Sequence, residues 1–224
     1  MAGVLGDASL ESLLARLNAQ SEAQEAETSA YFRRRGEAGE LSWEGLDADA
    51  HRFMADKLVA LDPAKAEFCY LLCRALGARR VVEVGTSHGV STLHLAAALR
   101  DNGGGVVIAT EHEPEKARAA RANFEAAGLS SFIELREGDL RETLKSLQGP
   151  IDFVLIDIWT EMARPALELI APHLRGGAMV CADNTGGFRD PYRAYFDFVN
   201  DPANGFRTLT LPFEGGFELT VKVG

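Results

Sequence analysis

Polar side chains close two apolar runs in the second half of the chain. Asp157 ends the run 151–157, and Asp183 and Asn184 follow the run 177–182. If both runs are parallel strands, their carboxyl ends lie at one edge of a sheet, where ligands gather. An all-oxygen set of this kind suits a hard cation, Mg²⁺ or else Ca²⁺ or Mn²⁺. The structural alternative is a cap at Asp157 and a turn at Asp183 and Asn184, and the sequence leaves both open.

A glycine-containing turn follows the apolar run 80–84. Gly85 and Gly89 would let the backbone bend sharply and approach a ligand closely, and the amides at the start of the next helix attract an anion. An acid that ends the following strand, here Glu111, is expected to hold ribose hydroxyls. Ser87 stands where a dinucleotide fingerprint needs its middle glycine, so a pyrophosphate has little room. The turn therefore favours S-adenosylmethionine, which carries no phosphate.

Strand-like and helix-like runs alternate from residue 79 onward, as in a parallel sheet covered on both faces. The pattern predicts an α/β fold, a Rossmann-like doubly wound sheet of seven mostly parallel strands ending in an antiparallel hairpin. Strands are expected near 80–84, 105–110, 131–136, 151–157, 177–182, 206–211 and 217–223. Helices are expected near 89–100, 114–127, 139–147, 161–173 and 192–199.

The N-terminal part is predicted to be helical. Leu10, Leu13, Leu14 and Leu17 form an i, i+3, i+4, i+7 stripe on a helix that continues toward Phe32. This stripe packs either on its own domain or on a second subunit, and we predict a homodimer to which it contributes. A further helix over 63–76 begins with Asp62 as N-cap and Pro63 as its first residue. We divide the chain into a helical extension, 1–56, and one α/β domain, 57–224.

Composition excludes several classes of function. The 224 residues carry a formal net charge of −10, and their one basic cluster, Arg33–Arg35, offers no face for nucleic acid. No apolar run reaches the roughly 18 residues of a membrane span, and no signal peptide is visible, so we expect a cytoplasmic protein with no membrane partner. Cys69 and Cys73, at i, i+4 spacing, are expected to be small core residues.

Several short motifs together resemble those of one family. Over roughly 57–224 the chain is similar to the bacterial members of the catechol and caffeoyl-coenzyme A type of S-adenosylmethionine-dependent O-methyltransferases. The motifs are Asp62-Pro63-Ala64-Lys65, Val82–Ser91, Thr110-Glu111 with Pro114, Glu137-Gly138-Asp139, Asp157-Ile158-Trp159, Asp183-Asn184-Thr185 and the glycine-rich final hairpin.

The resemblance implies a role for each matching residue. Gly85 and Ser91 would meet the methionine carboxylate of the cofactor, Glu111 its ribose and Asp139 its adenine. The residues expected around the cofactor are Glu83, Gly85, Ser87, Gly89, Ser91, Glu111, His112, Gly138, Asp139, Asp157 and Trp159. Those expected to hold a divalent cation are Asp157, Asp183 and Asn184, and those expected to be catalytic are Asp157 and Glu161.

One position departs from the family pattern. Where the family has a lysine as general base, three residues after the metal aspartate, this chain has Thr160. Either a bound metal acidifies the acceptor enough for solvent or another group to take the proton, or the acceptor is not a catechol. The candidate substitutes for the lysine are Glu161, His88 and Lys57, and the candidate residues of the acceptor pocket are Phe188 and Arg189.

The expected activity is metal-assisted methyl transfer from S-adenosylmethionine to a hydroxyl of a small aromatic acceptor with vicinal hydroxyls. A metal-independent O- or N-methyltransferase is the alternative within the same chemistry. An NAD(P)-dependent oxidoreductase shares the strand, turn and ribose acid, but Ser87 and the lack of a Tyr-x-x-x-Lys pair oppose it. A non-catalytic binding protein is the third class, which the missing lysine suggests and the intact set of acids opposes.

Overall fold

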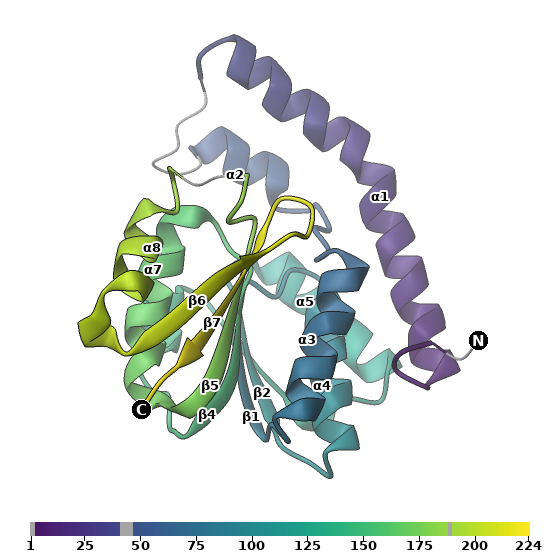
Figure 1. Cartoon of the computed structure of the whole chain (residues 1–224). Coiled ribbons are helices and arrows are strands. Elements are labelled where there is room, and N and C mark those ends of the chain that lie inside the picture. The colour runs from purple at the N-terminus through teal and green to yellow at the C-terminus, as the bar shows by residue number, and fades with distance from the viewer. Residues whose placement is uncertain (1–2, 41–46, 188–189) are drawn as a thin grey trace.

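A computed structural model describes residues 3–40, 47–187 and 190–224. In the described residues it contains one seven-stranded sheet with the order β3-β2-β1-β4-β5-β7-β6, in which β7 runs opposite to the other six strands. The strands are β1 (Arg80–Val84), β2 (Val106–Glu111), β3 (Ile133–Glu137), β4 (Ile151–Ile156), β5 (Leu174–Asp183), β6 (Phe206–Leu211) and β7 (Phe217–Lys222). The predicted fold class, including the terminal hairpin, is confirmed (Figure 1).

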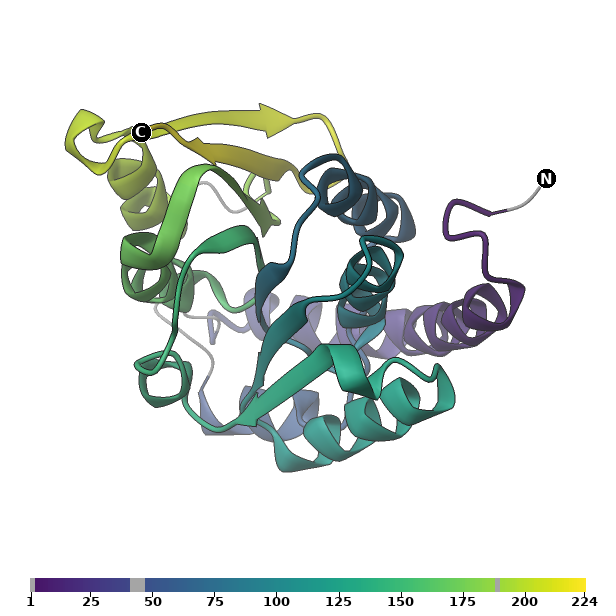
Figure 2. The same cartoon turned by 90° about the horizontal axis from the view of Figure 1, so that it is seen from below.

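Helices cover both faces of the sheet, as Figures 1 and 2 show. Neighbouring residues of a strand point to opposite faces, so that Val81 belongs to one apolar cluster and Val82 to the other. The first cluster includes residues of α1 (Ala8–Glu37), α3 (Pro63–Ala75), α4 (Val90–Asp101) and α5 (Pro114–Ala126). The second includes residues of α6 (Leu140–Thr143), α7 (Thr160–Ile170) and α8 (Arg193–Asn200).

The bounds of several elements shift by a few residues; β5, for example, begins at Leu174 instead of residue 177. Two elements differ more. The helix expected over 139–147 ends at Thr143, whose carbonyl accepts a hydrogen bond from the Arg136 guanidinium at 2.7 Å. The short α2 (Ala48–Met54) was not predicted, although Asp47 caps it by accepting hydrogen bonds from the amides of Asp49 and Ala50.

The leucine stripe of α1 packs on its own chain. Leu10, Leu13, Leu14 and Leu17 are all buried and belong to the same apolar cluster as residues of α3 and α4. Of the two readings that the sequence left open, the structure supports packing on the same domain. The stripe therefore gives no support to the predicted homodimer.

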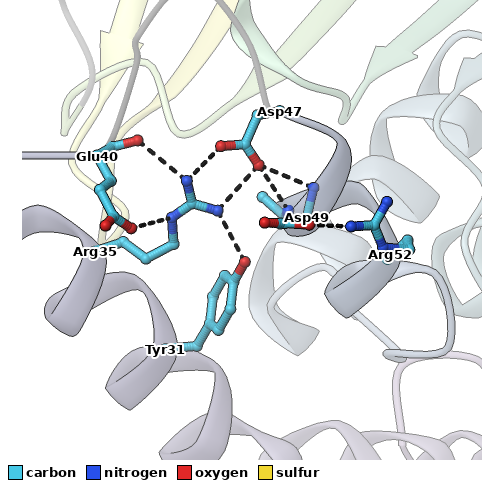
Figure 3. A network of polar contacts seen from close by, with 7 residues as sticks. Tyr31, Arg35, Glu40, Asp47, Asp49 and Arg52 are labelled. Carbon is cyan, nitrogen blue, oxygen red and sulfur yellow. Dashed lines mark hydrogen bonds and ion pairs between the residues drawn. The ribbon is translucent and has the colours of Figure 1, made fainter.

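The far end of α1 is joined to α2 by polar contacts (Figure 3) and by an aromatic contact. Arg35 donates hydrogen bonds from Nη1 to Asp47 Oδ1 and to the Tyr31 hydroxyl, both at 3.0 Å. The Tyr31 ring stacks on Phe53 with centroids 3.8 Å apart. This contact fixes α2 against α1, above the sheet edge at which β1, β2, β4 and β5 end (Figure 1).

Two further expectations concern cysteines and membranes. Cys69 and Cys73 are buried free thiols in the core, as predicted. Among the described residues, no helix has both the length and the apolar character needed to cross a bilayer.

Candidate active site

The turn after β1 is shaped by close contacts between protein segments. Gly85 has φ +94°, and a Cβ there would lie 1.9 Å from the carbonyl oxygen of Asp157, at the end of β4. Gly89 has φ +86°, and its Cβ would meet the Phe124 ring at 2.3 Å. The sequence reasoning assigned these glycines to close approach of a ligand, whereas the described contacts are with the chain itself. A role for either glycine toward a cofactor stays a prediction.

Glu83 holds this turn from within the core. Its side chain is fully buried, and Oε2 accepts hydrogen bonds from Thr86 Oγ1 at 3.0 Å and from Thr92 Oγ1. Burial raises the pKa of Glu83 to about 7, although both hydroxyls favour the charged form. Glu83 thus joins β1 to the first turn of α4. A contact of Glu83 with the cofactor stays a prediction.

Glu111 lies beside the turn, as predicted from its place at the end of β2. Its Oε2 accepts a hydrogen bond from the Ser87 amide at 2.7 Å, and its Oε1 accepts one from the Glu113 amide at 2.9 Å. Ser87 adopts φ +48°, which turns its amide toward this carboxylate. The contact brings the predicted ribose acid to the predicted nucleotide turn, while His112 next to it is exposed.

Asp139 follows β3 and caps α6. It accepts a hydrogen bond from the Arg141 amide at 2.9 Å and pairs with the Arg141 guanidinium at 2.6 Å. These hydrogen bonds hold the pKa of Asp139 at about 2, so it is ionised at neutral pH. Gly138 before it, with φ +117°, donates its amide to the Glu111 carbonyl at 2.9 Å. Glu111 and Asp139 are therefore neighbours at the same sheet edge.

Asp157 and Asp183 end the adjacent parallel strands β4 and β5, one residue beyond the paired Ile156 and Ala182. Burial, followed by the charge of Asp183, raises the pKa of Asp157 to about 8. Burial also raises the pKa of Asp183. Two acids thus share one edge, as the sequence predicts, and each disfavours the charge on the other.

Lys65 is the site residue that the sequence reasoning missed. Its Nζ lies 2.5 Å from Asp183 Oδ1, and the residue is only 4% exposed. Asp62 accepts hydrogen bonds from the amides of Ala64 and Lys65, so the predicted cap places this lysine in the first turn of α3. A signal was available, because Lys65 shares the helical face of Phe68, Cys69 and Leu72 at i+3, i+4 and i+7.

The three predicted metal ligands do not form an open cation site. Asp183 Oδ1 is bonded to Lys65, and Oδ2 accepts a hydrogen bond from Asn184 Nδ2 at 3.2 Å. A divalent ion beside Asp183 would therefore stand next to the Lys65 ammonium and be repelled by it. No group of three His, Cys, Asp or Glu side chains suited to a metal occurs in the described part of the chain. The residues as arranged do not fit a divalent cation.

The other predicted site residues lie on several different elements. Trp159 precedes α7 with 39% of its surface exposed, and Glu161 is exposed in the first turn of that helix. Ser91 is buried in the first turn of α4, whose start has no side-chain cap. Lys57 pairs with Glu27 and Asp56 and lies over the Phe53 ring, away from Asp183.

His88, the last of the candidate substitutes for the lysine, is half-buried, and burial lowers its pKa. Its backbone carbonyl accepts a hydrogen bond from Asn123 Nδ2 at 2.9 Å. Phe188 and Arg189, predicted to line the acceptor pocket, lie outside the described residues.

Comparison with known proteins shows that this chain is similar to methyltransferases. Residues 82–185 match a family model described as a methyltransferase domain. The chain is 34% identical to catechol O-methyltransferase of Niastella koreensis over 134 residues, which cover 56% of this chain and 58% of that protein. It is 35% identical to catechol O-methyltransferase of Mycobacterium tuberculosis over 127 residues, covering 56% and 57%. The chain thus spans less than two thirds of the length of these relatives.

Solved structures agree with the sequence relatives. An O-methyltransferase from Bacillus cereus in complex with SAH is 26% identical, with a TM-score of 0.65 over 73% of this chain and 82% of that one. The cofactor-bound protein Rv0187 from MTB is also 26% identical, with a TM-score of 0.71 over 97% and 91%. Both the sequence and the fold of this chain are therefore similar to those of O-methyltransferases, in agreement with the resemblance of its motifs.

Proposed function

We propose that this protein transfers the methyl group of S-adenosylmethionine to a hydroxyl oxygen of a small molecule. The hydrogen bond from the Ser87 amide to Glu111 is the observation that carries the proposal, since it joins the ribose acid to the glycine turn inside the matched methyltransferase domain. In the transfer, the acceptor oxygen forms a bond to the methyl carbon while the carbon–sulfur bond breaks. The product is the methyl ether and S-adenosylhomocysteine.

The cofactor would lie along the carboxyl ends of β1, β2 and β3. The uncapped start of α4, at Val90 and Ser91, suits its methionine carboxylate. Glu111 would accept the ribose hydroxyls, and Asp139 would accept the adenine amino group. Most of the rate enhancement would come from holding the acceptor oxygen in line with the sulfonium methyl, which supplies on the order of 7 to 11 kcal/mol.

The acceptor would be aromatic and carry vicinal hydroxyls. The rings of Phe68, Phe213 and Phe217 surround the hairpin end beside Lys65, with centroids 5.7 to 6.4 Å apart. Trp159, two residues after Asp157, offers a further exposed ring. The two bacterial relatives are catechol O-methyltransferases, which agrees with an acceptor of this class.

The divalent cation that the resemblance implies is not part of this proposal. The Lys65–Asp183 ion pair favours the alternative of metal-independent transfer. The cytoplasmic location remains a proposal. The homodimer also remains a proposal, but the leucine stripe no longer supports it, because its leucines are buried within one chain.

The direct test is transfer of isotope-labelled methyl from S-adenosylmethionine to catechol, followed with and without chelator. We expect methylated catechol in both conditions and calorimetric binding of S-adenosylmethionine but not of NAD(P)H. Binding of the cofactor without transfer to any of a panel of phenols, catechols and amines would leave a non-catalytic binding protein. Binding of NAD(P)H in its place would point to the oxidoreductase.

A further inference from the structure

Lys65 is a charged residue in a place that opposes charge. It lies in the first turn of α3, where the helix dipole is positive and a cation is unfavourable. Its side chain is only 5% exposed, and burial further disfavours an ammonium. The shortest contact that compensates both effects is the 2.5 Å bond from Nζ to Asp183 Oδ1.

In the described residues, the Lys65 ammonium donates fewer hydrogen bonds than it can. A lysine has three N–H groups, and in the described part of the chain one of them bonds to Asp183. The Phe217 ring centroid lies 5.8 Å from Nζ, and a Cβ on Gly215 would be 3.9 Å from it. The two remaining N–H groups therefore have no described acceptor, and the surroundings are a carboxylate, an aromatic ring and a bare glycine of the hairpin loop.

The two neighbouring carboxylates, Asp157 and Asp183, also favour a cation at this place. Asp157 and Asp183 end adjacent strands, and Lys65 is bonded to one of them. The Lys65 ammonium is thus held by one carboxylate, and its charge also acts on the second, Asp157.

We propose that the Lys65 ammonium is the fixed cation of the acceptor site, binding the reacting oxygen of the acceptor in place of a metal ion. This inference rests on the proposed function. The acceptor hydroxyl releases its proton to water as it binds, and its oxyanion accepts a hydrogen bond from Nζ. The oxygen then attacks the methyl carbon, and the electron pair of the carbon–sulfur bond goes to sulfur. Asp183 keeps the ammonium in position, and Lys65 is a catalytic residue because it touches the reacting oxygen.

The role of Lys65 can be measured with two acceptors, catechol and the more acidic 4-nitrocatechol. Lys65→Met should lower kcat/KM for catechol by at least about 100-fold, the effect of losing one donor to a developing oxyanion. The loss for 4-nitrocatechol should be smaller, because that oxyanion needs less stabilisation. Lys65→Arg should restore part of the activity. Lys145→Met, at an exposed lysine of the same charge, is the matched control and should leave kcat/KM unchanged for both acceptors.

Three results separate this inference from the proposed function. Calorimetry should show S-adenosylmethionine binding unchanged within about 2-fold in Lys65→Met; a wild type that binds the cofactor but methylates nothing would remove the proposed function and the inference together. Equal losses for both acceptors, with active wild type, would show a merely structural ion pair and overturn the inference alone. So would full activity of Lys65→Met.

A measurement on the wild type needs no folded variant. Titration with Mn²⁺, followed by its paramagnetic resonance signal, should show no stoichiometric site, and chelator should leave the rate unchanged. One tightly bound Mn²⁺ per chain, lost in Asp183→Asn, together with a chelator-sensitive rate, would overturn the inference and restore the divalent cation.

Discussion

At the scale of single residues, Glu111 is the most direct test of the cofactor site. Its carboxylate is held toward the nucleotide turn by the amides of Ser87 and Glu113. Glu111→Ala should weaken S-adenosylmethionine binding by roughly 1.5 to 3 kcal/mol, the value of hydrogen bonds to a charged group. Calorimetric titration measures the effect, with Glu125→Ala, an exposed glutamate of α5, as the control. Unchanged affinity in a folded Glu111→Ala protein would remove Glu111 from the site.

Glu83 should make stability depend on pH. Because its pKa is raised from 4.5 to about 7 in the folded protein, its contribution to stability is fully present below about pH 4.5 and is lost as the pH rises through 7. Glu83→Gln should remove this part of the pH dependence and stabilise the protein above pH 7 by roughly 1 to 3 kcal/mol. Urea unfolding of both proteins at pH 5 and pH 8 tests it. The same pH dependence in both proteins would contradict the burial argument.

Sequence reasoning located the acids of the site but not their cation. Glu111, Asp157 and Asp183 could be placed because an acid at a strand end has a fixed position in a parallel sheet. The spacing of Lys65 could show that it lies on the apolar face of α3, but not that its partner is Asp183, which is 118 residues away and meets it only through the packing of α3 against the end of β5. The contact of Gly85 with the Asp157 carbonyl was hidden for the same reason.

At the scale of elements, the tightest contact joins the glycine turn after β1 to the end of the neighbouring strand β4. Gly85→Ala combines a positive φ with a Cβ 1.9 Å from a backbone oxygen, and should cost roughly 3 to 5 kcal/mol of unfolding free energy. Gly128 also has a positive φ, +65°, but open space around it, so Gly128→Ala should cost only about 1 to 2 kcal/mol. Denaturant unfolding of the two variants compares them. Equal costs would mean that the turn can move away from β4.

The elements themselves were largely predictable. Strands and helices with strong periodicity or a clear cap were placed correctly. One of them is α3, which begins at Pro63 after the N-cap Asp62. The short α2 has too few residues to show a period, and its position depends on the distant contact of Asp47 with Arg35. Local pattern fails where an element is held by another element instead of by its own sequence.

At the scale of the whole molecule, α1 is expected to stabilise its own domain. Leu14 is 4% exposed and lies in the cluster shared with α3 and α4. Leu14→Ala should therefore lower the free energy of unfolding by about 2 to 5 kcal/mol, the cost of a cavity in a core. Leu71→Ala, at a leucine of α3 that is 51% exposed, is the matched control and should cost far less. Denaturant unfolding at fixed protein concentration measures both.

The same variants decide what α1 does for assembly. Because the stripe is buried within one chain, the mass in solution should be the same for wild type, Leu14→Ala and Leu71→Ala, whatever that mass is. Sedimentation equilibrium provides the comparison, at a temperature where each protein is folded. If Leu14→Ala instead lowered the mass and left the unfolding free energy of the separated chains unchanged, the stripe would serve a second subunit. That result would support the predicted homodimer, with the stripe as part of its interface.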